Sequence, residues 1–194
     1  MEYLCLISQN SIFMKTFAKI FLTAIFMVTI IRFADAQFLP VDETTKKVTY
    51  QEVVPIEGST PTKLYNLAIE WINSFYNNPS DATRVRDPDN GRIEVKHRIK
   101  VFNLDKNGNK TTESEVVSYE MTLEFKDGRY RYTITNFNVE RTSRFPLERW
   151  LDKNDPQYSA VCDVYLQQLN EEINKLIKSM KEGIKPKVIK EDNW

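Results

Sequence analysis

Apolar and polar side chains alternate with a period of two through the middle of the chain. The alternation runs through residues 92–102, 117–125 and 129–134, and the turn signals Asn107–Gly108 and Asp127–Gly128 separate the three segments. Because successive side chains of a strand point to opposite faces, the pattern predicts three long strands joined in a meander. Each strand is apolar on one side only, so we expect an antiparallel sheet with one covered face.

Two helices are expected to cover the apolar face of this sheet. The first starts at residues 59–61, Ser-Thr-Pro, where a hydroxyl residue caps the helix and proline occupies its first position. Apolar residues then follow at spacings of three and four as far as Phe75. The second helix extends from Pro156 to about Glu182, carries a four-three apolar stripe, and is stopped by Gly183. Both apolar stripes are available to pack against the sheet.

Two shorter strands complete the expected order. β-Branched residues at 47–56 predict a strand before the first helix, and residues 83–87 predict one after it. Residues 140–155 are irregular, with one turn of helix expected at 146–151. The predicted fold class is therefore α+β, with a curved antiparallel sheet of about five strands, two helices on one face, and the order β-α-β-β-β-β-α.

The start of the chain has the features of a secretory signal peptide. Lys15 and Lys19 precede an apolar run of twelve residues, 20–31, and residues 34–36, Ala-Asp-Ala, offer small residues at the two positions that a signal peptidase reads. The run is shorter than the roughly 20 residues that a spanning helix needs, so a retained membrane anchor is the weaker alternative. We expect export to the periplasm or outer cell envelope, with no membrane span after cleavage.

Cleavage of this leader defines the expected domain boundaries. Residues 1–36 form the signal peptide, and residues 1–13 precede the expected start at Met14, because they lack a basic, signal-like pattern. Residues 37–183 are expected to form a single domain, and residues 184–194 a charged C-terminal tail.

The composition argues against several kinds of chemistry. The chain has 27 Lys and Arg against 27 Asp and Glu, with one histidine and two cysteines. Neutrality argues against a dedicated nucleic-acid binder, and the scarcity of His and Cys argues against metal sites and nucleophile–histidine pairs. His97 falls on the apolar side of its strand and is expected to be structural. Cys162 falls on a helix stripe and is expected to be buried and inert. We predict no cofactor, no metal and no catalytic residue.

The uncovered face of the sheet is the candidate binding surface. Its expected outward residues are eight Lys or Arg and three Glu: Arg84, Arg86, Arg92, Lys96, Arg98, Lys100, Arg129, Arg131, Glu94, Glu120 and Glu124. All of the basic residues except Arg92 are predicted binding residues. Such a face suits an anionic partner. The alternative is an ordinary solvated face on which Glu120 and Glu124 form cross-strand ion pairs with the basic strands beside them.

Several motifs resemble those of a known family. They are Leu39–Pro40, Val48–Thr49–Tyr50, Glu52–Val53–Val54, Leu64–Tyr65 with Ala68 and Trp71, and residues 132–136, Tyr-Thr-Ile-Thr-Asn. They are similar to the exported bacterial family called domain of unknown function 4468, which has a TATA-binding-protein-like (TBP-like) fold. The resemblance covers roughly residues 39–139 and implies this fold and export. It implies no chemistry, since the family has no established activity or catalytic residues.

These observations favour an exported, non-catalytic cell-envelope domain. Its expected partner is an envelope protein or an anionic polysaccharide, held on the open sheet face or by pairing at a sheet edge. A nucleic-acid partner is not expected, because an exported chain with no apolar wedge residues on its outer face does not suit one. Two alternatives are an exported hydrolase that uses carboxylates, and a self-associating module in which two copies join their sheets as a homodimer.

Overall fold

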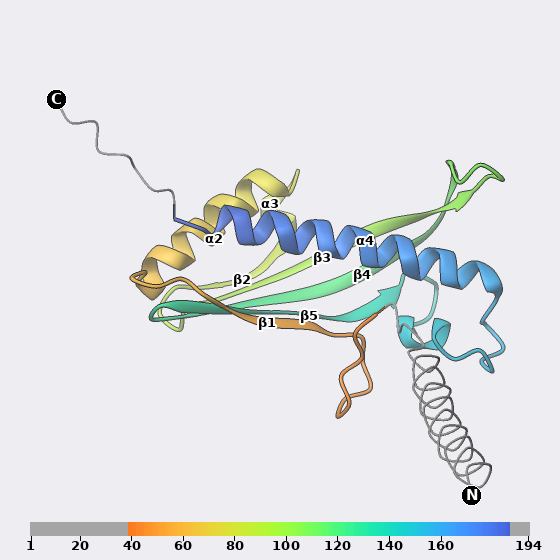
Figure 1. Ribbon diagram of the computed structural model, residues 1–194, viewed down its shortest axis with the longest axis horizontal. Helices are drawn as coiled ribbons and strands as arrows, with labels where there is room; N and C mark the ends of the chain where they lie inside the picture. The colour runs from red at the N-terminus through yellow and green to blue at the C-terminus, as the bar shows by residue number, and fades with distance from the viewer. Residues whose placement is uncertain (1–38, 187–194) are drawn as a thin grey trace, which may run out of the picture. The chain divides into compact units, whose positions relative to one another are not determined.

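The computed structural model describes residues 39–186. The strands are β1 (Tyr50–Pro55), β2 (Thr83–Asp87), β3 (Arg92–Leu104), β4 (Lys110–Lys126), β5 (Arg129–Val139) and β6 (Phe145–Pro146). The helices are α2 (Pro61–Phe75), α3 (Pro79–Ala82), the short 3-10 helix η1 (Leu147–Trp150) and α4 (Ala160–Gly183). The strands form one antiparallel sheet in the order β1-β5-β4-β3-β2, with β6 paired to β5 (Figure 1).

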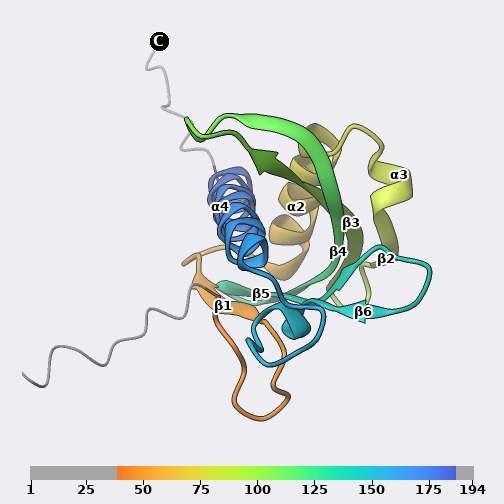
Figure 2. The same cartoon turned by 90° about the vertical axis from the view of Figure 1, so that its right-hand side faces the viewer.

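The sheet curves around its two long helices. Figure 2 shows α2 and α4 side by side on the concave side of the sheet. The apolar residues of the alternating segments face these helices, and the most deeply buried of them include Ile93, Met121, Leu123 and Ile134. The predicted α+β class, the one-sided sheet and the two covering helices are therefore confirmed.

Helix α2 begins where its capping residues predict. The side chain of Thr60 accepts a hydrogen bond from the Lys63 N–H, at 3.3 Å, and Pro61 occupies the first helical position. Leu64 and Ile72 are fully buried on the face that the apolar spacing predicts. Thr60 rather than Ser59 is the N-cap residue.

Two predicted boundaries shift because local turns compete with regular structure. Strand β1 starts at Tyr50 rather than at residue 47, because the Val48 N–H donates to the Glu148 carboxylate, at 2.9 Å, and not to a neighbouring strand. Helix α4 starts at Ala160 rather than Pro156, since the Tyr158 N–H donates to the Asp155 carbonyl in a preceding turn, at 2.9 Å.

The predicted leader, residues 1–36, lies outside the described residues, as do residues 187–194 of the predicted tail. Within residues 39–186, no helix is both long enough and apolar enough to cross a membrane.

The two long helices meet closely at the last residue of α4. A Cβ atom added at Gly183 would lie 2.6 Å from the Cδ1 atom of Trp71, whose indole N–H donates to the Ser179 hydroxyl at 3.1 Å. Both the ring and its hydrogen bond hold the helices at this spacing. A methyl group at this position therefore has no room unless the helices move apart.

Gly183→Ala is expected to lower the free energy of unfolding by about 1–3 kcal/mol, the usual cost of overpacking. Alanine is a better helix former than glycine, so a loss of stability identifies the clash with Trp71. Urea unfolding of this variant and of the exposed neighbour Glu182→Ala, which should leave stability nearly unchanged, makes the measurement. Equal or higher stability of Gly183→Ala would show that the helices separate at no cost.

Candidate functional site

The outer face of the sheet carries ion pairs between its basic residues and nearby glutamates. They are Lys96–Glu120 at 3.3 Å, Arg98–Glu140 at 3.0 Å, Lys100–Glu113 at 2.9 Å, Arg131–Glu124 at 2.5 Å and Arg92–Glu94 at 2.5 Å. The alternative of cross-strand pairing by Glu120 and Glu124 is thus confirmed. Glu113 and Glu140 reduce the positive charge further, and the sequence interpretation did not include them.

Glu120 illustrates how these pairs affect ionisation. Burial by itself would raise the pKa of its carboxyl group, but hydrogen bonds from Asn136, at 2.6 Å, and from Lys96 outweigh burial and lower the pKa. The carboxylate therefore stays ionised and opposes the charge of Lys96. Such exposed pairs contribute only about 0–1 kcal/mol each to stability, so their main effect is on the charge of the face.

The prediction that Arg86 lies on this face is wrong. Arg86 pairs directly with Ile93, and residues opposite each other in an antiparallel ladder share a face. Ile93 is fully buried on the helix side, so Arg86 lies at the rim of that side. The physical reason is an irregularity in the pairing between Thr83 and Val85, which breaks the alternation of β2.

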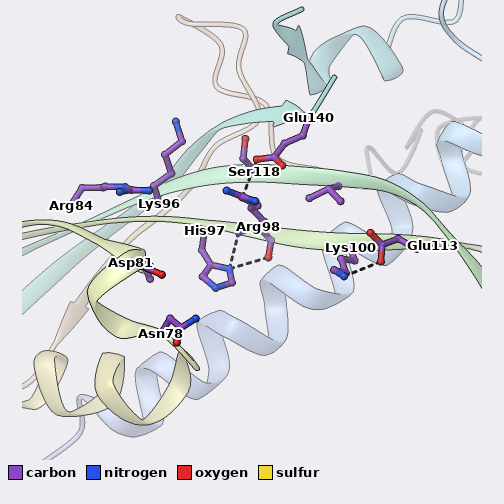
Figure 3. Close-up of a pocket in the computed structure, with 12 residues that line it drawn as sticks. Asn78, Asp81, Arg84, Lys96, His97, Arg98, Lys100, Glu113, Ser118 and Glu140 are labelled. Carbon is purple, nitrogen blue, oxygen red and sulfur yellow. Dashed lines mark hydrogen bonds and ion pairs between the residues drawn. The ribbon is translucent and has the colours of Figure 1, made fainter. Parts of the chain in front are cut away.

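Four of the predicted binding residues come together beside one strand. Arg84, Lys96, Arg98 and Lys100 line a groove of about 750 Å³, which extends from α3 across β3 onto the outer face (Figure 3). We call this the outer groove. Its volume falls within the range of about 300–1,000 Å³ that is common for binding sites.

Arg129 and Arg131 lie elsewhere. With Val53 and Lys126 they surround a separate hollow of about 210 Å³ near the β4–β5 turn. The strand register places Arg131 opposite Glu124, which is in turn opposite Arg92, at the end of the sheet where β2 begins its turn into β3. The predicted basic surface is therefore two sites rather than one.

The outer groove runs along a free edge of the sheet. Strand β2 pairs with β3 only over residues 92–95, and from Lys96 onward β3 has a strand neighbour on the β4 side alone. Strand β3 extends beyond the end of β2 because β3 has 13 residues and β2 has 5. A strand that outlasts its neighbour leaves unpaired N–H and C=O groups along that side.

Side chains bond three backbone groups on this edge, which belong to Arg98 and Phe102. The Gln168 amide bonds both polar groups of Phe102, accepting from its N–H at 3.1 Å and donating to its carbonyl at 2.8 Å. The Arg98 N–H donates to Nδ1 of His97 at 2.7 Å. Because alternate residues of a strand direct their peptide groups to the same side, the groups of Lys96 and Lys100 face this edge too. We call the stretch from Lys96 to Lys100 the open edge.

A second hollow lies on the helix side of the open edge. Its volume is about 400 Å³, and its lining includes Phe75, Tyr76, Ile99 and Leu176. We call it the aromatic groove. The ring of His97 packs against the ring of Tyr76, with centroids 4.8 Å apart and the ring planes tilted by 37°, and Phe75 is 40% exposed. His97, Arg98 and Lys100 line both grooves, so the open edge separates them.

His97 and Cys162, the two side chains considered for catalysis, lie in surroundings typical of structural residues. His97 is half-buried between Tyr76 and the Arg98 peptide, as expected of a structural histidine. Cys162 is 3% exposed in the first turn of α4, where its sulfur accepts from the Ser159 N–H at 3.4 Å, so the predicted burial is confirmed. Within residues 39–186 no group of three or more His, Cys, Asp or Glu side chains is arranged to hold a metal ion.

Six carboxylates of the described chain are held in the ionised form by their surroundings. Every one with a clearly displaced pKa has it lowered, as hydrogen bonds stabilise the ionised form: Asp42, Glu52, Asp87, Asp105, Glu120 and Asp155. A glycosidase-type acid needs a raised pKa. These six carboxyl groups therefore do not have the raised pKa that such an acid needs.

These elements define the class of protein, an α+β domain whose open antiparallel sheet carries its long helices on one face. Residues 50–140 match the sequence model of a family described as "Domain of unknown function (DUF4468) with TBP-like fold". This match to the DUF4468 family confirms the resemblance in the motifs of the chain. A search of curated proteins finds no match.

Two solved structures share the fold. A TBP-like protein from Parabacteroides distasonis is 16% identical, with a TM-score of 0.60 over 76% of this chain and 97% of its own. A DUF4468 family protein from Bacteroides ovatus is 15% identical, with a TM-score of 0.59 over 80% of this chain and 98% of its own. At these identities the likeness concerns the fold.

Proposed function

We propose that this chain is an exported binding module that takes an extended segment of a partner protein at the open edge of β3. The observation that carries the proposal is that the peptide groups of Lys96 and Lys100 face away from β4, between two grooves. An added strand would gain main-chain hydrogen bonds from this edge. Pockets on either side of it would then select the side chains of the strand.

The two grooves match the geometry of an added strand. Side chains of a strand alternate between the two faces of a sheet, so one set would enter the outer groove and the other the aromatic groove. Helix α3 leads directly into β2 and contacts β3, so the partner would lie beyond α3 and pair with β3 toward Lys100. The Gln168 amide on Phe102 limits the row at its far end.

Export forms part of the same proposal. The leader at residues 1–36 would deliver the domain to the cell envelope, where its partner would be an envelope protein. The sheet edge supports a protein partner better than the outer face supports a polysaccharide, because glutamates pair with most of the basic residues there.

The test uses unconstrained dodecapeptides displayed on phage and selected on the purified protein. We expect selected peptides to bind Lys100→Pro at least tenfold more weakly than the parent. Proline removes the edge N–H and places its ring on the edge without breaking a bond to β4. Lys100→Ala removes the same side-chain charge but keeps the N–H, so the loss of affinity that Lys100→Pro shows beyond Lys100→Ala measures the contribution of the edge N–H.

Circular dichroism and urea unfolding confirm that Lys100→Pro is folded. Arg129→Ala, in the separate hollow, is the control for a change of charge elsewhere on the sheet. Selection of no peptide, or of peptides that bind the parent and a folded Lys100→Pro variant equally well, would overturn the proposal.

A further inference from the structure

Four positively charged side chains lie beside the open edge. Lys96, Arg98 and Lys100 occupy consecutive outward positions, and Arg84 adds a fourth cation at the end of the groove nearest β2 (Figure 3). All four are solvent-exposed, with 66% of the Arg98 side chain and 61% of the Lys100 side chain accessible. A strand added here would have its outward side chains directly beside this row of cations.

The carboxylates that pair with these cations lie across β3 from the open edge. Glu113 and Glu120 belong to β4, and Glu140 follows β5. On the open side the outer groove has one carboxylate, Asp81 of α3. Within residues 39–186 Arg84 forms no ion pair. The lining of the outer groove holds four cations against the three carboxylates of Asp81, Glu113 and Glu140, so a partner approaching from the open side meets a small excess of positive charge.

The helix side of the open edge is mainly apolar, whereas the outer side is charged. The aromatic groove presents the partly exposed ring of Phe75, together with Tyr76, Ile99 and Leu176. Lys110 and Glu172 lie among its lining residues. Side chains that point to this side of an added strand would bury apolar area against rings, which favours aliphatic or aromatic residues.

We propose that the partner segment is a strand in which acidic and apolar residues alternate, with its acidic side chains beside Lys96, Arg98 and Lys100 and its apolar side chains in the aromatic groove. This inference rests on the proposed function, since it names the ligand of the same edge. The open edge spans five residues, about 16 Å at roughly 3.3 Å per residue. A segment of five to seven residues is thus sufficient.

A second copy of this chain fits the edge poorly. If two copies paired their β3 edges, the outward row of one would face the outward row of the other, so that Lys96, Arg98 and Lys100 would meet cations. Like charges directly opposite each other are destabilising, and lysines on an edge strand commonly prevent such self-pairing. The same charges attract an acidic strand, so the edge discriminates between the two occupants.

The test compares three fluorescein-labelled heptapeptides by fluorescence anisotropy. The first alternates glutamate and isoleucine, beginning and ending with glutamate. The second replaces each glutamate with lysine, and the third has the composition of the first with four glutamates followed by three isoleucines. We expect the first to bind at least tenfold more tightly than the other two. Its binding should weaken as salt rises, because the pairs are exposed.

A matched experiment reverses the charges on the protein instead of those on the peptide. The double variant Lys96→Glu/Lys100→Glu should bind the glutamate peptide at least tenfold more weakly and the lysine peptide more tightly than the parent does. Lys126→Glu, a reversal on the same sheet outside both grooves, should change neither affinity by more than about twofold. Urea unfolding confirms that each variant is folded.

The outcomes separate this inference from the proposed function. If phage-selected peptides bind in a manner that Lys100→Pro abolishes, but the alternating glutamate peptide does not bind, the acidic partner is wrong and the edge site stands. If Lys100→Pro affects no peptide, both are wrong. If sedimentation shows a dimer that Lys100→Pro dissociates, the occupant is a second copy and the inference is overturned.

Discussion

Trp150→Ala is expected to lower the free energy of unfolding by about 3–5 kcal/mol, which is the usual cost of removing a fully buried tryptophan side chain. Trp150 closes the short helix η1 and is 1% exposed. Its ring packs against Tyr165 of α4, with centroids 5.6 Å apart, and against Phe145 of β6 at 6.3 Å. The substitution therefore opens a cavity where η1, β6 and α4 meet.

Trp150→Phe separates the ring from its polar atom. The indole N–H of Trp150 is buried without a hydrogen-bond partner, so its removal gives up no hydrogen bond. Phenylalanine should therefore cost less than half as much as alanine. Urea unfolding measures both, with Lys153→Ala as an exposed control that leaves stability unchanged. A loss below about 1 kcal/mol for Trp150→Ala would mean that η1 is not part of the core.

This part of the chain is the least predictable from sequence. Residues 140–155 show neither a period of two nor a period of 3.6, and the predicted turn of helix at 146–151 is confirmed as η1. A two-residue strand and a single helical turn are too short to produce a periodic pattern. Their burial depends on contacts with α4, which follows them in the chain. Sequence reasoning could place the turn but not its role in the core.

The long strands were predictable because each one has enough residues to show its alternation. The position of β1 was not, since it pairs with β5, about 80 residues later, as in the pair Glu52–Tyr132. This pairing puts the first strand beside the last long strand and leaves β2 at the other edge. Local patterns identify strands, whereas the order of strands depends on contacts between distant segments.

The candidate site was predicted in part. The alternation of β3 correctly places Lys96, Arg98 and Lys100 on the outer face. The free edge beside them was not predicted, because the sequence patterns do not show which strands pair or how far the pairing extends. The interruption in pairing near Val85 reversed the face of Arg86, because one extra residue changes the parity of every later position. Such irregularities carry no signal in a single sequence.

The aromatic groove had no signal in the sequence either. Phe75 belongs to the predicted apolar face of α2, and its 40% exposure depends on how the end of that helix meets β3 and α4. Gln168 similarly reads as a polar residue within a helix, although its amide bonds the edge of a strand. Both features arise from packing between elements that lie far apart in the chain.

Raising the pH above 10 is expected to destabilise the domain steeply, because buried tyrosines must lose protons on unfolding. Burial raises the pKa of Tyr119 to about 12, even though a hydrogen bond with Tyr76, at 3.0 Å, acts in the opposite direction. Burial also raises the pKa of Tyr50, Tyr76, Tyr130 and Tyr132 well above the ordinary value. An unfolded tyrosine ionises near pH 10, so each contribution is complete below pH 10 and is lost as the pH rises.

The pH range of this loss follows from the upward shift in the pKa of the buried tyrosines. Between pH 10 and 12 the unfolded chain releases protons that the folded chain retains, so stability falls with pH. Tyr119 alone accounts for a loss on the order of 2–3 kcal/mol by pH 12, because one pKa unit corresponds to about 1.4 kcal/mol. With the other four tyrosines, the loss is comparable to the whole stability of an ordinary domain, about 5–15 kcal/mol. We therefore expect unfolding before pH 12.

Urea unfolding at pH 8, 10 and 11, together with the absorbance of tyrosinate at 295 nm, measures this effect. The rise in tyrosinate from the five buried rings should be cooperative and should coincide with loss of the circular dichroism signal. Tyr119→Phe removes one titrating group and should reduce the slope of stability against pH above 10, compared with the slope of the parent protein. Ionisation of Tyr119 near pH 10 in a chain that stays folded would show that water reaches the interior between α2 and the sheet.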